Sequence, residues 1–345
     1  MNNTDKDMIM PAEWEHQWGI QLTWPHAGTD WNYCLDDICR TYVEMADIIT
    51  RHEHLLVVTP DIECVSQQLS AKLSRQQMDS VVFFKCPTND TWARDHGFIT
   101  VADKDQRYLL DFKFNGWGEK FAADKDTLIN SRLYSGGLIK GCYKDCNDFV
   151  LEGGSIESDG KGTVFTTSMC LLAPHRNQPM TKKDIEERLK KSLCADRIVW
   201  IDHGSLIGDD TDGHIDTIVR TAPGDTLVYV GCDDVDDEQY EDFRLMEEQL
   251  KRFRTADGRP YNLVRLPMPD AIVEDGERLP ATYANFLILN GAVIVPTYAQ
   301  KEKDDEAMRL IAGVFPGREI AGVDSRVIIR QHGSVHCCTM QFFED

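Results

Sequence analysis

The sequence predicts a mixed α/β fold. Short runs of β-branched and aromatic residues alternate with amphipathic stretches of helical period along all 345 residues. Asn290–Gly291 lies between two apolar runs, which is the strongest signal for a two-residue hairpin turn. No stretch rich in Pro, Gly or Ser divides the chain, so we expect residues 1–345 to form one domain.

The expected strands are short apolar runs bounded by turn-forming residues. In chain order they are Leu55–Thr59, Val81–Cys86, Tyr108–Phe114, Val150–Glu152, Val164–Thr167, Arg197–Ile201, Thr226–Val230, Leu263–Leu266, Phe286–Leu289, Val293–Pro296 and Ser325–Arg330. The expected helices carry apolar residues every three or four positions. They are Cys34–Arg51, Ile62–Gln77, Lys182–Ser192, Asp237–Arg254 and Lys303–Val314. Pairs of short strands with one helix recur about every 60 to 70 residues, although the segments are too dissimilar to establish a repeat.

The charge balance excludes several classes of partner. The 58 acidic and 37 basic residues give a net charge of −21. Nucleic-acid binding needs clustered Lys and Arg, so we expect no nucleic-acid partner, whereas a small cationic substrate fits an acidic surface. No apolar run reaches the roughly 18 residues of a membrane span, and no secretory signal is recognisable. The 11 cysteines lack a disulfide framework, so we expect reduced thiols in a cytoplasmic protein.

Five motifs place ionisable or thiol side chains beside glycine or beside apolar runs. They are Asn89–Gly97, Glu152–Ser155, Asp212–Asp216, Asn285–Gly291 and His332–Thr339. In the first, Arg94 is a candidate to orient a neighbouring carboxylate. The fourth is explained by its hairpin turn, and its residues alone assign it no chemistry.

Two of these motifs leave alternatives open. Glu152 ends an apolar run, where a carboxylate must be paired or functional, but a glycine-rich hairpin with a solvated Glu explains it equally well. His214 and Asp216 are two residues apart, so on a strand they would share one face. That spacing suits a base and a carboxylate acting on one ligand, and it also suits a metal site.

Cys337 follows His336 in a glycine-containing segment, which makes it a candidate nucleophile, although such a pair is more often part of a core. The chain has no Cys-x-x-Cys pair, and Cys142 and Cys146 lack a second pair, so we expect no structural zinc. A carboxylate pair, a His, a Glu and a Cys together suit a metal-free site for a planar cation such as guanidinium. A thiolate would attack its central carbon and a His would protonate the departing nitrogen.

At these residues the sequence resembles the agmatine deiminase family, relatives of bacterial-type peptidyl-arginine deiminase within the guanidine-modifying superfamily. The motifs that carry the resemblance are Met10–Glu15, Thr23–His26, Trp92–Gly97, Phe114–Gly118, Glu152–Gly154, Asp159–Thr167, Thr211–Asp216, Asn285–Tyr298 and His336–Gln341. They span nearly the whole chain in the family's order. The resemblance implies a five-bladed α/β propeller of pseudo-fivefold modules around a central active site.

The resemblance also implies an activity, which is hydrolysis of agmatine to N-carbamoylputrescine and ammonia in putrescine and polyamine biosynthesis. It implies that the reaction needs no metal and no organic cofactor, and it is compatible with a homo-oligomer. The implied site consists of the nucleophile Cys337, the general acid and base His214, Glu152 that orients it, Asp95 and Asp216 that hold the guanidinium, and Trp92 that walls the substrate channel. Cys338 would be a bystander.

Three positions depart from the family pattern. His332–Gly333 stands where the family has Gly-Gly, Phe98 where it commonly has Pro, and Thr221 where it usually has Phe. None of the three replaces a residue with an implied role in the reaction, so we expect them to affect the choice of substrate more than the activity itself. The alternatives are a deiminase of peptidyl-arginine or of another guanidine, amidino transfer to an amine, a non-catalytic guanidine-binding protein, and a metal-dependent hydrolase using His214 and Asp216. A deiminase of arginine would need a group, typically an Arg, to meet the substrate carboxylate.

Overall fold

Most strands belong to sheets built on one pattern. The computed structural model describes residues 8–343, and within them four three-stranded sheets repeat an antiparallel pair followed by a helix and a parallel third strand. The first two units are β4 (Ile99–Ala102), β5 (Arg107–Lys113), α6 (Ile129–Ser135) and β6 (Cys142–Val150), then β7 (Ile156–Ser158), β8 (Thr163–Thr167), α8 (Lys182–Leu193) and β9 (Arg197–Ile201). The next two are β10 (Val219–Ala222), β11 (Thr226–Gly231), α9 (Tyr240–Arg252) and β12 (Asn262–Pro267), then β15 (Leu287–Ile288), β16 (Ala292–Thr297), α10 (Lys301–Val314) and β17 (Glu319–Asp324).

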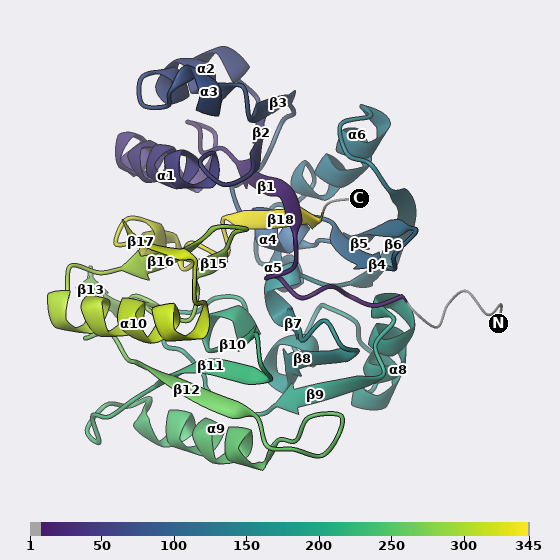
Figure 1. Ribbon diagram of the computed structural model, residues 1–345, viewed down its shortest axis with the longest axis vertical. Helices are drawn as coiled ribbons and strands as arrows, with labels where there is room; N and C mark the ends of the chain where they lie inside the picture. Colours follow the sequence, from purple (N-terminus) through teal and green to yellow (C-terminus); the bar gives the residue numbers. More distant parts are fainter. Residues whose placement is uncertain (1–7, 344–345) are drawn as a thin grey trace.

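A four-stranded sheet joins the two ends of the described chain. Its elements are β1 (Gln17–Thr23), α1 (Leu35–Ile49), β2 (His54–Thr59), α2 (Ile62–Ser70), α3 (Arg75–Met78), β3 (Val81–Lys85) and β18 (Thr339–Phe343). The strand β18 runs antiparallel to β1, with Thr339 opposite Leu22. It therefore takes the place that the first strand of the antiparallel pair has in the other four units. Figure 1 shows β18 lying beside β1.

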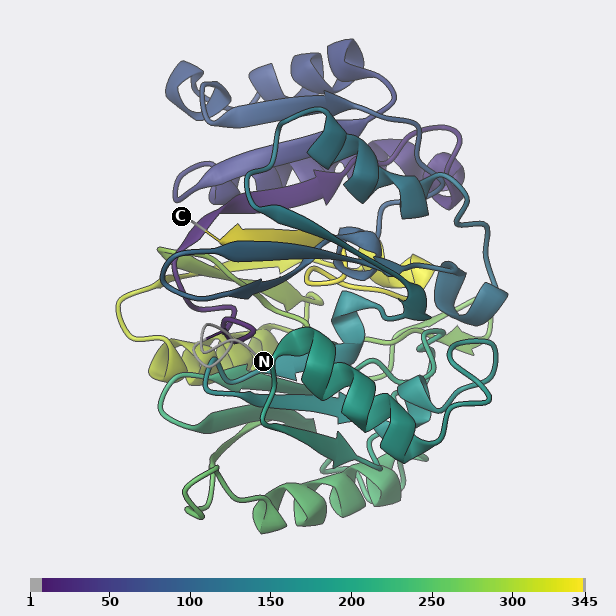
Figure 2. The same ribbon diagram turned by 90° about the vertical axis from the view of Figure 1, so that its right-hand side faces the viewer.

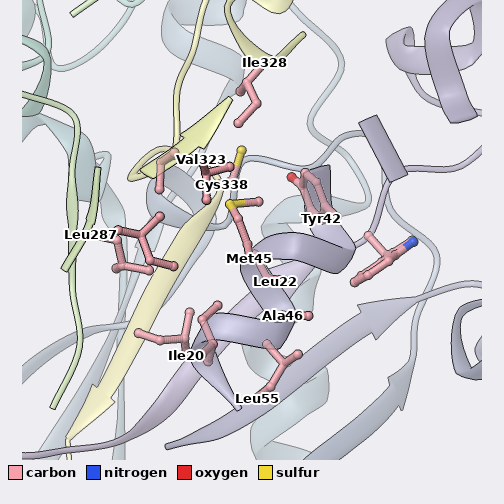
Figure 3. Close-up of a cluster of buried hydrophobic side chains, with 14 of the residues drawn as sticks. Ile20, Leu22, Tyr42, Met45, Ala46, Leu55, Leu287, Val323, Ile328 and Cys338 are labelled. Atoms are coloured by element: carbon pink, nitrogen blue, oxygen red, sulfur yellow. The ribbon is translucent and has the colours of Figure 1, made fainter. Parts of the chain in front are cut away.

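The helices of the five units lie outside the strands. Figure 1 shows α1, α6, α8, α9 and α10 around the periphery, and the turned view in Figure 2 shows the sheets stacked between them. Each long helix buries one face because its apolar residues recur at helical spacing. In α1 this face is Ile38, Tyr42, Met45 and Ile49, all fully buried. Tyr42 and Met45 of this face belong to the cluster drawn in Figure 3, together with Ile20 and Leu22 of β1 and Leu55 of β2.

The predicted elements agree with the structure in most places and differ in three. The predicted strand Ser325–Arg330 is wrong, because β17 pairs with β16 earlier in the chain and Ile328–Gln331 forms a 3-10 turn that buries Ile328 and Ile329. The predicted helix Ile62–Gln77 is interrupted, since Ser74 caps α3 through a reciprocal capping box with Gln77. The predicted strand Val150–Glu152 is wrong in extent, because β6 ends at Val150.

No helix of residues 8–343 combines the length and the apolar composition that a membrane span requires.

Candidate active site

The predicted site residues lie in short turns just before the strands β4, β7, β10 and β18. Asp95 lies in α4 (Ala93–His96) and Glu152 precedes the 3-10 turn Gly153–Ser155. His214 precedes the 3-10 turn Ile215–Thr217, which contains Asp216, and Cys337 lies just before β18. All five side chains belong to residues that are at most 5% exposed.

The backbone at Gly154 is the point on which three of these side chains converge. A Cβ atom at this position would lie 2.6 Å from His214 Nδ1, 2.9 Å from Asp95 Oδ1 and 3.2 Å from Asp216 Oδ2. The Gly154 N–H also donates to Asp95 Oδ1 at 3.2 Å. Only glycine allows the backbone this close to the three groups.

Cys337 lies on the wall of a cavity of about 320 Å³. Its other lining residues are the aromatic Trp92, Trp117 and Phe121, the acidic Asp30, Asp90, Asp95 and Asp210, and Thr211, Gln331, His332 and Gly333. The Trp92 indole N–H donates to Asp90 Oδ2 at 3.1 Å, which fixes the ring in this wall. The cavity is large enough for a small ligand, and its charged lining is anionic.

The thiol of Cys337 is held by one amide and one carboxylate. Its Sγ lies 3.4 Å from Asn285 Oδ1 and 3.8 Å from Asp216 Oδ2. Asn285 Oδ1 also accepts the backbone N–H groups of His336 and Cys337. Burial, together with Asp216 and Asp95, raises the pKa of Cys337 well above its usual value. The protein alone therefore favours the thiol over the thiolate.

The two aspartates differ in their surroundings. Asp95 accepts the Trp117 indole N–H at 2.9 Å, and burial raises the pKa of Asp95 to about 6 although the neighbouring His214 opposes the rise. Asp216 accepts from His336 Nδ1 at 2.7 Å. Burial alone would raise the pKa of Asp216, but His336 outweighs it and the pKa is lowered. Asp216 is therefore the more firmly ionised of the pair.

A buried chain of charges continues behind Asp216. The imidazole of His336 bridges Asp216 and Glu13, with Nε2 lying 2.7 Å from Glu13 Oε2. Arg220 donates to Glu13 Oε2 and to Glu157 Oε1, both at 2.6 Å. His336 Nδ1 is in position to donate to Asp216, whereas Nε2 lies near both Glu13 Oε2 and, at 3.0 Å, the donor Nη2 of Arg220.

Glu152 and His214 form a second buried group. Glu152 accepts from Arg176 Nε at 3.1 Å, and Arg176 also donates to Asp212 Oδ2 at 2.6 Å. Burial lowers the pKa of His214, but Asp95, the thiol of Cys170 and Glu152 outweigh it, so that the pKa is raised well above its usual value. His214 is thus favoured as an imidazolium.

Two interpretations of the sequence are corrected. His214 and Asp216 do not share a face of a strand, because the chain forms a 3-10 turn there before β10 begins at Val219. Arg94 does not orient a carboxylate. Its Nη1 donates to Gln341 Oε1 at 2.7 Å, and its backbone N–H donates to the carbonyl of Cys337 at 3.2 Å. Arg94 instead holds the segment that carries the thiol.

The three departures from the family pattern have local explanations. His332 has φ +66°, a conformation that glycine adopts more easily, and its Nδ1 lies 2.7 Å from the carbonyl of Gly208. Thr221 donates its hydroxyl to Glu157 Oε2 at 2.8 Å, so it joins the ion pairs of Arg220. Phe98 is buried in the apolar cluster around β5 and α6.

Two buried groups of residues have metal-ligand composition. They are Glu152, Cys170 and His214, and Glu13, Glu157 and His336, with the possible ligand atoms of each group within 4.8 Å of one another. In both groups an arginine already pairs with a carboxylate, Arg176 with Glu152 and Arg220 with Glu13 and Glu157. A metal ion would have to compete with these guanidinium groups, so both groups fit a metal poorly.

Sequence reasoning missed several side chains of this site. Asn285 begins a motif that was explained by its turn alone, and nothing in its spacing indicated a contact with the thiol. Arg176 lies between His175 and Asn177 without any recognisable motif. His336 was recognised only as the neighbour of Cys337.

Comparison with known proteins identifies relatives over the full length. The family model described as Porphyromonas-type peptidyl-arginine deiminase matches residues 9–342. A Mycoplasma capricolum protein named "Putative agmatine deiminase" is 32% identical over 366 residues, covering 99% of this chain and 98% of that protein.

Two solved structures are similar throughout. A Porphyromonas gingivalis protein described as a "Putative Arginine Deiminase" is 47% identical, with a TM-score of 0.92 over 97% of this chain and 98% of the other. A C. jejuni agmatine deiminase with a cysteine replaced by serine and with substrate bound is 36% identical, with a TM-score of 0.89 over 98% of this chain and 96% of the other. The predicted mixed α/β fold is confirmed.

Proposed function

Because this chain belongs to the Porphyromonas-type peptidyl-arginine deiminase family, whose members are C–N hydrolases acting on guanidino groups, we propose that it hydrolyses agmatine to N-carbamoylputrescine and ammonia. This reaction would supply putrescine and polyamine biosynthesis. The named relatives support agmatine, and so does the chemistry of the cavity beside Cys337.

The observation that carries the choice of substrate is the charge of the cavity lining. Asp30, Asp90 and Asp210 lie in the lining beside Asp95, and no Lys or Arg from residues 8–343 takes part in it. The ammonium end of agmatine suits these carboxylates, whereas the carboxylate of arginine would meet no cation. Arginine is the second candidate substrate, because the family is named for peptidyl-arginine and the Porphyromonas gingivalis relative is described as an arginine deiminase.

In this proposal Asp95 and Asp216 hold the guanidinium of the substrate, and Trp92 walls the channel. Each carboxylate can accept paired N–H bonds in the plane of the guanidinium. The cation offsets the two negative charges that raise the pKa of the Cys337 thiol, so binding of substrate favours the thiolate. Cys337 is therefore a thiolate mainly when the guanidinium of the substrate is bound.

The thiolate of Cys337 attacks the central guanidinium carbon and a C–S bond forms. His214, held as an imidazolium beside Asp95 and oriented by Glu152, gives its proton to the departing nitrogen, and ammonia leaves as the C–N bond breaks. The covalent thiouronium remains on Cys337. His214 then takes a proton from water, and the hydroxide adds to the same carbon. The C–S bond breaks to return the Cys337 thiolate, and the added hydroxyl loses its proton to solvent as the neutral ureido product leaves.

We further propose that the chain is one domain and that the four-stranded sheet and the four three-stranded sheets surround this site as a five-bladed propeller. The repeated order of strands and the pairing of β18 with β1 support this arrangement. The site residues come from turns of several units, as a central site requires.

The expected result of a direct assay is ammonia release from agmatine at least about tenfold faster than from arginine or from a peptide with a C-terminal arginine, because the substrate carboxylate would lack a partner. The rate with agmatine should persist in excess chelator. The measurement is ammonia release with the three substrates side by side. Faster release from arginine would contradict the choice of substrate, and loss of activity with chelator would contradict a metal-free reaction.

Replacing His336 by Gln should weaken the binding of agmatine, and so raise its KM, most strongly at low pH. His336 lowers the pKa of Asp216, so without this contact the pKa of Asp216 rises and Asp216 is protonated as the pH falls. A charge-assisted hydrogen bond contributes about 1.5–3 kcal/mol, which corresponds to roughly tenfold to a hundredfold in KM. Steady-state kinetics between about pH 5.5 and 8.5 measure the effect.

His203→Gln is the matched control, because His203 pairs with Asp242 at the surface. Its pH profile should equal that of the parent. If His336→Gln lowered activity by the same factor at every pH, His336 would have a structural role only.

A further inference from the structure

A second cavity, of about 570 Å³, lies away from the site. It is bounded by the start of β1, the connection from α1 to β2, the start of α3 and the turn before β16. Its lining residues are His16, Gln17, Trp18, Thr50, Arg51, His52, Glu53, His54, Ser74, Gln76, Gln77, Ser80 and Asn290. The parallel strands β1 and β2 begin at this cavity, whereas Asp30 and Asp90 of the catalytic cavity follow the far ends of β1 and β3.

The amide of Gln17 leaves one buried acceptor at this cavity. Its Nε2 donates to the backbone carbonyls of Glu13 and Ile288, so the orientation of the amide is fixed. A flipped amide would place oxygen against two carbonyl oxygens. Gln17 Oε1 is buried and accepts no hydrogen bond from residues 8–343.

The carboxyl of Glu53 leaves a second buried acceptor. Its Oε2 accepts the backbone N–H of Asn290 at 2.8 Å, and Glu53 is 9% exposed. Its Oε1 has no hydrogen-bond partner among the residues that the structure describes. The nearby Arg318 directs Nη2 to the carbonyl of Trp14. Glu53 and Gln17 both line this cavity, and each leaves one side-chain oxygen without a partner, which costs free energy unless something supplies one.

The remaining charges around the cavity are already paired. Arg51 and His52 both contact Glu319, with Arg51 Nη1 2.9 Å from Glu319 Oε1 and His52 Nε2 3.2 Å from Oε2. Neither is therefore directed to Glu53. No ion pair joins Glu53 to a cation within residues 8–343, so the carboxyl is available to an incoming one.

An aromatic wall completes the cavity. The rings of Trp18 and His54 stack with their centroids 5.1 Å apart. His54 Nδ1 donates to the carbonyl of Ser80 at 3.3 Å, which leaves Nε2 as an acceptor in the neutral ring. A methylene chain fits the face of an indole, and a cation beside it gains further attraction.

We propose that this cavity is a second binding site that takes an aliphatic di- or polyamine, with an ammonium group donating to Glu53 Oε1 and Gln17 Oε1. The methylene chain lies along Trp18 and His54. The net charge of −21 raises the local concentration of such cations. The site is separate from the catalytic cavity and independent of the reaction proposed for it.

The ionisation of Glu53 supplies a signature of this binding. Burial raises the pKa of Glu53 to about 8, with Glu13 adding to the rise while Asn290 and Arg318 oppose it. Near pH 7 the carboxyl is therefore mostly protonated, and a bound ammonium favours the carboxylate. Binding should release a proton and should tighten as the pH rises from about 6 to 8.

The test is calorimetric titration of the intact protein with 1,4-diaminobutane, in two buffers of different ionisation enthalpy near pH 7. We expect proton release on binding and, in Glu53→Gln, an affinity lower by about tenfold or more without proton release. Glu44→Gln is the matched control, since it makes the same substitution at an exposed position of α1. Uncharged 1,4-butanediol should not bind.

Ser80→Trp provides a second variant that fills the cavity without touching the two acceptors, in case Glu53→Gln does not fold. Both variants should still release ammonia from agmatine at the parental rate if the proposed reaction is right. Unchanged 1,4-diaminobutane affinity in folded Glu53→Gln or in Ser80→Trp would overturn the second site. So would an absence of binding to the parent, whatever the outcome of the agmatine assay.

Discussion

Cys337→Ser should abolish turnover of agmatine, whereas Cys338→Ser should preserve most of it. Cys337 faces the cavity beside Asp216, while Cys338 is fully buried in the apolar cluster with Tyr42 and Met45 (Figure 3). A serine hydroxyl is far less ionised than a thiol, so even a bound guanidinium cannot produce useful alkoxide. We expect a loss of at least about a thousandfold in kcat, measured by ammonia release.

Mass spectrometry after acid quench provides the complementary measurement. During turnover the parent should carry the thiouronium on Cys337, and Cys338→Ser should carry it as well. The serine in place of Cys338 conserves volume but buries an extra hydroxyl, so thermal unfolding serves as its control. If Cys338→Ser were inactive while folded and Cys337→Ser were active, the assignment would be wrong by one residue.

Asp95→Asn and Asp216→Asn should each lose agmatine binding, whereas Glu152→Gln should mainly lose rate. Both aspartates are buried and are proposed to face a permanent cation, so removal of either charge leaves that cation incompletely paired. Breaking a buried charge pair costs about 3–5 kcal/mol, or two to four decades in affinity. Glu152 is proposed to act through His214, so its loss should slow proton transfer more than it weakens binding.

Calorimetric titration with agmatine on a Cys337→Ser background separates the two effects, because no turnover interferes. Glu152→Gln should remain folded, since Arg176 keeps its contacts with Asp212 and the carbonyl of Thr211. Thermal unfolding of each variant checks this. Parental affinity in both aspartate variants would mean that the guanidinium is held elsewhere.

The residues proposed for the chemistry could be singled out from the sequence because they occur in compact motifs. Asp95, Glu152 and Cys337 each lie in recognisable sequence patterns, and the structure buries all three side chains. The residues that position them could not be predicted in the same way. Arg176 and Asn285 act through contacts between distant segments, and no local pattern reports such contacts.

The same distinction applies to the fold. Long helices such as α8 and α9 follow from their periodicity. The prediction for α8 was right to within one residue, and the prediction for α9 extended three residues before it and two after it. The strand β6 is mostly polar over Cys142–Asp148, so only its apolar end was recognised. Ser325–Arg330 has the composition of a strand, but the pairing of β16 with β17 was already complete at Asp324. Register depends on partners, which a single segment does not reveal.

The closure of the chain by β1 and β18 has a consequence for folding kinetics. Glu13 and His336, which contact each other beside this sheet, are 323 positions apart. Contacts of such separation form late, because the entropy of closing the intervening loop must be overcome first. Asp216 and Cys337 depend on these contacts for their positions. A refolding chain should therefore recover its helices well before it recovers its chemistry.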